Sequence, residues 1–149
     1  MDRLNLPSFA HKVIRKEDNL FIFDNSRKKY VALTPEEWVR QHFVHFLINY
    51  KSFPAGRIGN EITVTLNGMR KRSDTVDYDQ EGNPFIIIEY KAPSIKITQE
   101  VFNQIVRYNM VLRVKYLIVS NGINHYCCKI DYIRDTYEFL AEIPDFTQF

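Results

Sequence analysis

The sequence is poor in cysteine: it contains only Cys127 and Cys128, which are neighbours in the chain. Neighbouring residues of a strand point to opposite faces, so these two thiols cannot easily form a disulfide or share a metal ion. The chain also has no Cys-x-x-Cys motif and no Cys/His series at zinc-ligand spacing, which argues against a zinc site. We interpret both cysteines as free thiols in the core of a protein from a reducing compartment.

Glycine is scarce, with five residues in 149, and the sequence has no low-complexity tract. The longest apolar runs, such as residues 85–88 and 116–119, are far too short to span a bilayer. The chain begins Met-Asp-Arg and has no hydrophobic leader. Its length and its 45% of apolar residues suffice for a substantial core. These features predict one ordered globular domain over residues 1–149, in the cytoplasm and without a membrane partner.

Several enzyme motifs are absent as well. The sequence has no Gly-x-Ser-x-Gly elbow, no phosphate-binding loop and no dinucleotide fingerprint. An NTP-driven motor is therefore not encoded in this chain. The net charge of +2 neither requires nor excludes a nucleic-acid partner. Basic residues instead gather locally, at residues 27–29 and 70–72, and Arg107 and Arg113 lie on a later predicted helix.

Hydrophobic and turn-forming patterns predict an α/β protein of the α+β kind. Thr34 and Pro35 are an N-cap and a first helical residue, Thr98 caps a second helix, and Asn67-Gly68 is a strong hairpin signal. Because the strands on either side of the second helix must pair in parallel, the central sheet should be mixed and flanked by helices. The expected elements are an N-terminal hairpin of 20–24 and 29–33, a helix at 34–50, strands at 58–66, 71–78 and 85–91, a helix at 98–112, and strands at 116–119, 124–129 and 137–140.

Charged residues stand at the end of the most apolar strand, where Glu89 and Lys91 follow residues 85–88. A hairpin centred on residues 79–83 sets Tyr78 near Phe85 and Asp74 opposite Glu89. Directly opposed residues have Cβ atoms about 5 Å apart, and two carboxylates at that separation repel by roughly 3 kcal/mol at an effective dielectric near 20. A Mg²⁺ ion bound between the two carboxylates would offset this repulsion, so a metal site would explain why two acids face each other here.

Other interpretations of these residues stay open. The Glu-x-Lys tripeptide is a weak signal by itself, and a surface salt bridge at the strand end explains it equally well. Asp77 and Asp79 compete with Asp74 for the role of the first acid. Asp79 is better explained as a turn residue, and Asp77 lies on the strand face opposite to Asp74, so it would need another register.

Polar residues on the two predicted helices are further candidates. Gln104 and Tyr108 are four residues apart, so they share a helix face and could point at the strand ends. Spacing alone favours a half-buried amide and a core tyrosine, with Val101, Ile105, Tyr108 and Leu112 facing inward. Glu37 completes a capping box and could also be a third acid that supports a cation. His42 and His45 have no partner ligands in the pattern and are interpreted as packing or surface residues.

Taken in order, Asp74, Glu89-Tyr-Lys91 and Gln104-Ile-Val-Arg-Tyr108 resemble the Asp … Glu-x-Lys … Gln-x-x-x-Tyr series of PD-(D/E)xK nucleases. The chain looks most like the N-terminal nuclease domain of the restriction (R) subunit of type I restriction enzymes. The wording of residues 33–41, 89–93, 108–110 and 116–122 is similar too, and the likeness extends over most of residues 15–145.

This resemblance implies a restriction-endonuclease-like αβββαβ core. It implies that Asp74 and Glu89 bind Mg²⁺ (or Mn²⁺), that Lys91 orients the attacking water, and that Gln104 and Tyr108 line the site near DNA. It also implies an acid on the first helix that supports the cation, and Glu37 is the residue that matches best.

The expected activity is therefore that of a Mg²⁺-dependent DNA endonuclease with little sequence preference. Contacts to DNA are expected from a set of residues around the acids: Arg70, Lys71, Arg72, Gln104 and Arg107. Partners would be DNA and other subunits of a restriction–modification system. The alternative is a nuclease fold kept as a DNA-binding or assembly module, with weak or absent catalysis.

Overall fold

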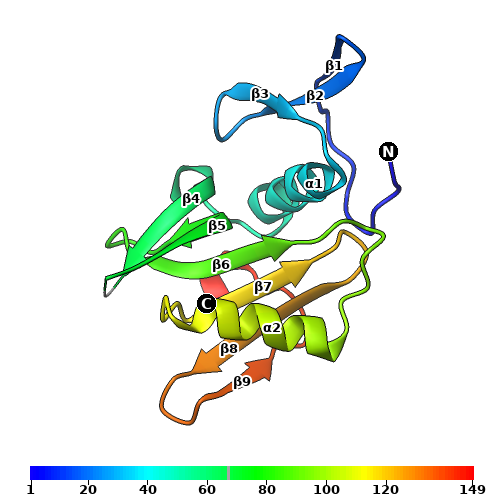
Figure 1. Ribbon diagram of the computed structural model, residues 1–149. Helices are drawn as coiled ribbons and strands as arrows, with labels where there is room; N and C mark the ends of the chain where they lie inside the picture. The colour runs from blue at the N-terminus through cyan, green and yellow to red at the C-terminus, as the bar shows by residue number, and fades with distance from the viewer. Residues whose placement is uncertain (67) are drawn as a thin grey trace.

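The computed structural model describes residues 1–66 and 68–149. Two sheets and two α-helices make up the molecule (Figure 1). The predicted Asn67-Gly68 turn includes Asn67, which lies outside the described residues. In chain order the elements are β1 Val13–Lys16, β2 Asn19–Asp24, β3 Lys29–Ala32, α1 Pro35–Tyr50, a 3-10 turn Ala55–Arg57, β4 Ile58–Leu66, β5 Met69–Tyr78, β6 Pro84–Tyr90, α2 Gln99–Met110, β7 Tyr116–Ser120, β8 His125–Asp131, β9 Thr136–Phe139 and a 3-10 turn Phe146–Gln148.

The central sheet is mixed, as the sequence predicts. Its six strands follow the order β4-β5-β6-β7-β8-β9, and β6 and β7 pair in parallel across the α2 crossover while the other neighbours are antiparallel. Strands β6 and β7 are apolar on both faces, because a helix covers each face of the sheet there. Alternation along β6 sends Ile86, Ile88 and Tyr90 into the core under α1, and Ile87 into the core under α2.

Helix α1 begins where the sequence predicts. The Thr34 hydroxyl accepts a hydrogen bond from the backbone N–H of Glu37 at 3.0 Å, and Pro35 is the first helical residue. The helix buries Val39, Phe43 and Leu47, which follow one another at a spacing of four residues and are 0% exposed. This apolar stripe fixes α1 against the sheet, and it directs the polar face of the helix toward β2, β4 and β5.

Helix α2 buries a different face from the one predicted. Its buried residues are Phe102, Val106 and Asn109, whereas Tyr108 is 64% exposed. The prediction of Tyr108 as an inward residue was therefore wrong. Phe102 decides the rotation of the helix, because its ring packs against Tyr126, Tyr137 and Phe139 of the distal strands, and an aromatic ring that buries this much area outweighs smaller aliphatic side chains.

The N-terminal sheet contains the predicted hairpin and one more strand. Strands β2 and β3 pair antiparallel, and β1 adds to the outer edge of β2, so the sheet stands beyond α1 away from the central sheet (Figure 1). All four residues of β1 are exposed. The sequence shows no hydrophobic alternation there, which is why this strand was missed. None of the described helices is long and apolar enough to cross a membrane.

Asp77 is a buried acid in the central sheet. It is 0% exposed, and neither carboxylate oxygen has a hydrogen-bond partner in the described part of the chain. Burial raises the pKa of Asp77 to about 7, although the charge of Arg57 and the backbone N–H of Tyr78 act in the opposite direction. The folded protein therefore holds a proton on Asp77 that the unfolded chain releases near pH 3.8, so stability falls as pH rises from there to about 7.

We predict that Asp77→Asn stabilises the protein increasingly as pH rises. The gain over wild type should grow by about 2 kcal/mol between pH 5 and pH 8, because asparagine has no charge to desolvate. Urea unfolding at both pH values measures it. Asp135→Asn, at an exposed turn position, is the matched control and should show no such slope. A pH-independent difference at Asp77 would contradict the prediction.

Candidate active site

Asp74 and Glu89 meet across strands β5 and β6. The register pairs Thr75 with Ile88, and its continuation by one residue sets Asp74 opposite Glu89, as the sequence predicts. The backbone N–H of Tyr90 donates to Oδ2 of Asp74 at 2.9 Å, which anchors this carboxylate beside the end of β6. At the other end of the hairpin, a bulge between Asp77 and Tyr78 pairs Tyr78 with Pro84, so the expected neighbour, Phe85, was wrong by one residue.

The Glu89 carboxylate lies in an environment that disfavours its charge. Its Oε1 is buried and has no hydrogen-bond partner in the described residues. Burial first, and then the neighbouring Asp74 carboxylate, raise the pKa of Glu89 to about 8, although the charges of Lys71 and Lys91 act in the opposite direction. The two acids therefore interact directly, and their repulsion is only partly relieved by the neighbouring lysines.

This pair of carboxylates fits a hard divalent cation. A buried carboxylate oxygen without a partner needs a proton or a cation, and Mg²⁺ prefers oxygen ligands. Clusters of three or more His, Cys, Asp or Glu side chains at metal-binding distance are absent from the described residues. A cation here would therefore take further ligands from backbone carbonyls or water, as magnesium sites often do.

Lys91 follows β6 on the side of the acid pair. Its backbone N–H donates to the carbonyl of Ser120 at 2.9 Å, so the chain continues in line with β7 beyond the end of β6. The side chain is half-buried, and its charge lowers the pKa of Glu89. The structure thus brings Asp74, Glu89 and Lys91 together.

A change of face in β4 and β5 brings a second lysine to the same place. The side chain of Asn60 points to the α1 side of the sheet, where its Nδ2 donates a hydrogen bond to Oδ2 of Asp24. Ile62 and Val64, in contrast, pack in the core under α2. Glu61, at φ 57°, separates the two patterns. Lys71 pairs with Val64 and therefore also faces α2.

Lys71 is only 6% exposed, in contrast to Arg70 and Arg72, which are exposed as expected. Its Nζ donates to Oδ1 of Asn109 at 2.7 Å and lies 3.0 Å from the centroid of the Tyr108 ring. Burial lowers the pKa of Lys71 to about 8, while the charges of Glu89 and Asp74 oppose this shift. Lys71 is thus an interior residue beside the acids, and the sequence indicated a surface residue.

The other α2 candidates lie at the surface. Gln104 and Arg107 are exposed, and the Arg107 Nε donates to the carbonyl of Asn103 at 3.4 Å. Tyr108 is exposed too, but one face of its ring covers Lys71. Of the two residues in the Gln-x-x-x-Tyr spacing, Tyr108 therefore reaches the lysine beside the acid pair, while Gln104 stands on the open face of the helix.

Glu37 belongs to an ion-pair network and not to the acid pair. Its two oxygens accept hydrogen bonds from Arg27, Arg40 and Gln41 at 2.7–2.9 Å. Burial alone would raise the pKa of Glu37, but these donors, Arg40 first, hold it below its usual range. The side chain does not complete a capping box, and its lone pairs are engaged by guanidinium groups, so we do not retain a cation-binding role for it.

Arg40 extends this network to Asp74. Its Nη1 lies 2.9 Å from the backbone carbonyl of Asp74 and 2.8 Å from Oε1 of Glu61. A second path runs from Asp24 through Asn60 and Thr75 to the Tyr90 hydroxyl. Both paths end on residues adjacent to the acid pair. A cleft of about 310 Å³ beside β3 is lined in part by Arg40, Asp74 and Tyr90. In the sequence this network is visible only as two spacings of three residues, from Asp24 to Arg27 and from Glu37 to Arg40.

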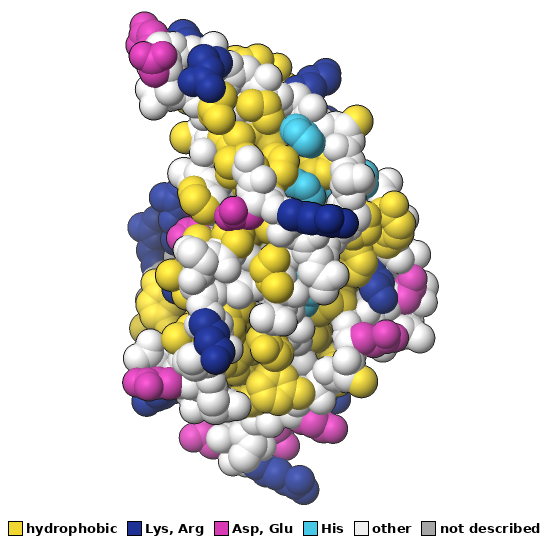
Figure 2. All heavy atoms as spheres, turned by 90° about the vertical axis from the view of Figure 1, so that its right-hand side faces the viewer, with side chains coloured by type: hydrophobic (Ala, Val, Ile, Leu, Met, Phe, Trp, Pro, Cys, Tyr) yellow, Lys and Arg dark blue, Asp and Glu magenta, His cyan; other side chains and the backbone are white. Residues whose placement is uncertain are grey.

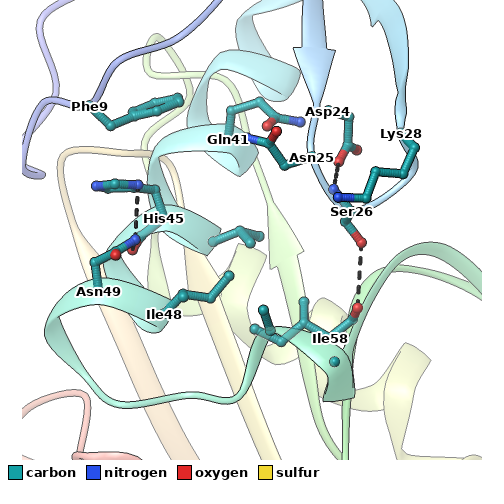
Figure 3. A pocket seen from close by; sticks show the side chains of 13 residues that line it. Phe9, Asp24, Asn25, Ser26, Lys28, Gln41, His45, Ile48, Asn49 and Ile58 are labelled. Atoms are coloured by element: carbon teal, nitrogen blue, oxygen red, sulfur yellow. Dashed lines mark hydrogen bonds between the residues drawn. The ribbon is translucent and has the colours of Figure 1, made fainter.

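A larger cavity lies elsewhere, between the β2–β3 turn and the opposite flank of α1 (Figure 3). It has a volume of about 600 Å³, and none of the predicted site residues lines it. Next to it, His42 and His45 pack with Phe9, His11 and Trp38 in an aromatic cluster, and Figure 2 shows histidines among hydrophobic side chains on that face. These histidines are packing residues, as the sequence predicts.

Arg40 should be the most sensitive residue of the network. We predict that Arg40→Gln destabilises the protein by about 3 kcal/mol, because it leaves the buried Glu37 carboxylate without its main partner. Arg40→Lys should rescue little, since one ammonium cannot replace the bidentate guanidinium. Urea unfolding measures both. The control Arg134→Gln, whose side chain is 83% exposed, should change stability by less than about 0.5 kcal/mol; an equal effect of the two Gln variants would contradict the network.

Comparison with known proteins places the chain in a family. Residues 35–144 match the family described as type I restriction enzyme R protein N terminus. None of the curated proteins matches. Among solved structures, a fragment described as an HsdR subunit of a type I restriction enzyme from Vibrio vulnificus YJ016 is 20% identical, with a TM-score of 0.52 over 75% of this chain and 24% of that one. A DrdV–DNA complex has a TM-score of 0.43 at 14% identity, over 73% of this chain and 11% of that one.

The fold agrees with this family assignment, because the mixed sheet and its two flanking helices are shared with the Vibrio vulnificus fragment. The chain spans about a quarter of the length of that relative. Asp74, Glu89 and Lys91 all lie inside the residues that match the family. The chain belongs to the family of type I restriction enzyme R protein N-terminal regions.

Proposed function

We propose that this protein is a Mg²⁺-dependent endonuclease of the PD-(D/E)xK type that hydrolyses DNA phosphodiester bonds with little sequence preference. The observation that carries the proposal is the buried, unpartnered Oε1 of Glu89 beside Asp74, with Lys91 on the same side. Structural ion pairs satisfy their charges with one another, whereas this group leaves two acids facing each other. We further propose that residues 1–149 act as one nuclease-like domain in the cytoplasm.

Asp74 and Glu89 would hold the cation, Mg²⁺ or Mn²⁺, together with a backbone carbonyl near Tyr90. When bound there, a divalent cation lowers the pKa of a water molecule and neutralises charge on the phosphate. The protein holds the ligands in advance: the Tyr90 N–H fixes Asp74, and Arg40 binds the backbone of the same residue. Such fixed ligands lose little entropy when the cation binds.

Lys91 acts on the water and on the phosphate. Its ammonium orients the water that attacks phosphorus and stabilises the charge that develops on the phosphoryl oxygens. The water oxygen forms the new bond to phosphorus and gives up a proton to solvent, one bridging phosphorus–oxygen bond breaks, and the leaving oxygen takes a proton from solvent. Positioning by Lys91 requires only that the ammonium stay near Glu89, and its effect on the Glu89 carboxyl supports that placement.

DNA would be bound through its backbone. Arg70 and Arg72 are exposed on β5 next to Asp74, and Gln104 and Arg107 are exposed on α2. Contacts of this kind neutralise phosphates, so binding should weaken steeply with salt and depend little on sequence. Base-reading helices and zinc modules are not among the described elements. Other subunits of a restriction–modification system would be the protein partners.

A DNA-binding or assembly module without catalysis is the second candidate. Two observations favour it: the net charge is only +2, and within the described residues only two acids, not three, converge at the site. Glu37, which could have supplied a third, is held by arginines. In this case the acid pair would be a relic of the fold, and metal binding would be weak or absent.

Plasmid nicking tests the nuclease directly. We predict that the wild type relaxes supercoiled plasmid with Mg²⁺ and that Asp74→Ala and Lys91→Ala lower the rate at least about 100-fold, because the first variant loses a ligand of the cation and the second loses the group that orients the water. Excess EDTA should abolish nicking. Asp135→Asn is the control for a harmless surface change. Equal nicking by all variants would remove these residues from the mechanism.

Calorimetry separates the two candidates. We predict that Mg²⁺ and Mn²⁺ bind the wild type and that Glu89→Gln loses at least about tenfold in affinity, since the neutral amide keeps the shape but not the charge. Thermal melting should show that this variant is folded, because removing a buried charge relieves desolvation. Intact binding of DNA by the wild type, measured by fluorescence anisotropy, without any binding of metal would support the module instead.

A further inference from the structure

Lys71 is buried without a counter-ion. It is 6% exposed, yet within the described part of the chain no carboxylate oxygen lies within 4 Å of its ammonium group. Its two partners are the Oδ1 of Asn109 at 2.7 Å and the ring of Tyr108, whose centroid is 3.0 Å away. A buried lysine normally pairs with an acid, because desolvation of an ammonium is costly. A neutral amide and an aromatic face hold the charge in place without neutralising it.

The acids closest to Lys71 are those of the proposed active site. Glu89 pairs with Val119 and lies two residues after Ile87 on the same strand. Because both Val119 and Ile87 pack under α2, Glu89 faces the α2 side as well. Lys71 reaches that side as well, because it pairs with Val64, which packs in the core under α2. The charges of Glu89 and Asp74 act on Lys71 across a gap that is too wide for a salt bridge.

Such a gap suits an anion that lies between the lysine and a cation held by the acids. An oxygen atom placed there would contact the ammonium on one side and the cation on the other, and its negative charge would relieve the repulsion between the two positive groups. A non-bridging phosphate oxygen has this character, and a lysine is a common point-charge ligand for phosphate.

We propose that Lys71 is a second lysine of the active site, which contacts the scissile phosphate from the α2 side while Asn109 and Tyr108 hold its ammonium group. This inference rests on the proposed nuclease function. Lys71 adds no covalent step: it stabilises the extra negative charge that the phosphoryl oxygens carry during attack by water. It also gives Tyr108 a role, since the exposed ring positions Lys71 and does not fill the core.

The test compares Lys71→Met and Lys71→Gln with wild type in two assays. Nicking of supercoiled plasmid with Mg²⁺ should fall at least about 100-fold in both variants, because transition-state charge loses a partner. Calorimetric titration with Mg²⁺ alone should show binding several-fold tighter than in wild type, because a like charge no longer faces the cation. A merely structural lysine would not move the two readouts in opposite directions. Lys129→Met, on the exposed face of β8, is the control and should change neither.

Each outcome decides the matter. Unchanged nicking, or Mg²⁺ affinity within twofold of wild type, overturns the role of Lys71 while leaving the nuclease intact. Loss of folding in both variants, seen by circular dichroism, also overturns it, because Lys71 would then be needed for structure. If the wild type neither binds Mg²⁺ nor nicks DNA, the proposed function itself fails, and that result is distinguishable because it appears before any variant is compared.

Discussion

The structure depends on two like charges that the sheet holds face to face. Asp74 and Glu89 lie opposite each other where β5 and β6 meet, and Oε1 of Glu89 is removed from water. Nothing in folding alone favours this arrangement, since apolar residues at both positions would pack without a penalty. The neighbouring cations relieve it incompletely: Lys71 and Lys91 act on Glu89 through space, and no described lysine or arginine forms a salt bridge with either acid.

A second group of charges surrounds this pair and is fully satisfied. Asp24, Arg27, Glu37 and Arg40 form buried ion pairs that join the N-terminal sheet, α1 and the start of the β4–β5 hairpin. Because Arg40 binds the Asp74 carbonyl and Asn60 leads to Thr75, the network fixes the backbone on which Asp74 stands. The ion pairs of this network neutralise one another and hold the backbone of Asp74 in place, whereas the charges of the acid pair are not neutralised and are available for chemistry. The two groups of charges meet at Asp74, which lines one cleft together with Glu37 and Arg40.

The sequence predicts the parts of the site that local rules govern. The apolar run 85–88, the turn at 79–83 and the period of two were enough to set Asp74 opposite Glu89, and one bulge near the turn did not change that register. Side chains placed by tertiary packing escaped prediction. The rotation of α2 follows Phe102, whose aromatic partners come from β8 and β9. The inward position of Lys71 follows from its pairing with Val64, which packs under α2, and the residue types of β5 carry no signal for it.

A comparison of the two orphaned acids shows why burial alone does not identify a site. Asp77 is buried and Glu89 is half-buried with a buried Oε1; each has an oxygen without a partner among the described residues, and burial raises the pKa of each. Asp77 lies among the apolar residues under α1, with Arg57 as the one charge that acts on it strongly. A proton removes its charge, and the residues that pair with it on the neighbouring strands are Ile58 and Ile86, neither of which can bind a cation through its side chain. Glu89 instead stands among Asp74, Lys71 and Lys91, whose charges all act on one carboxyl group. A proton on Glu89 would engage none of these three neighbours, whereas a cation would bind both acids and a phosphate would bind the lysines. This difference distinguishes a functional acid from a buried acid that the fold merely tolerates.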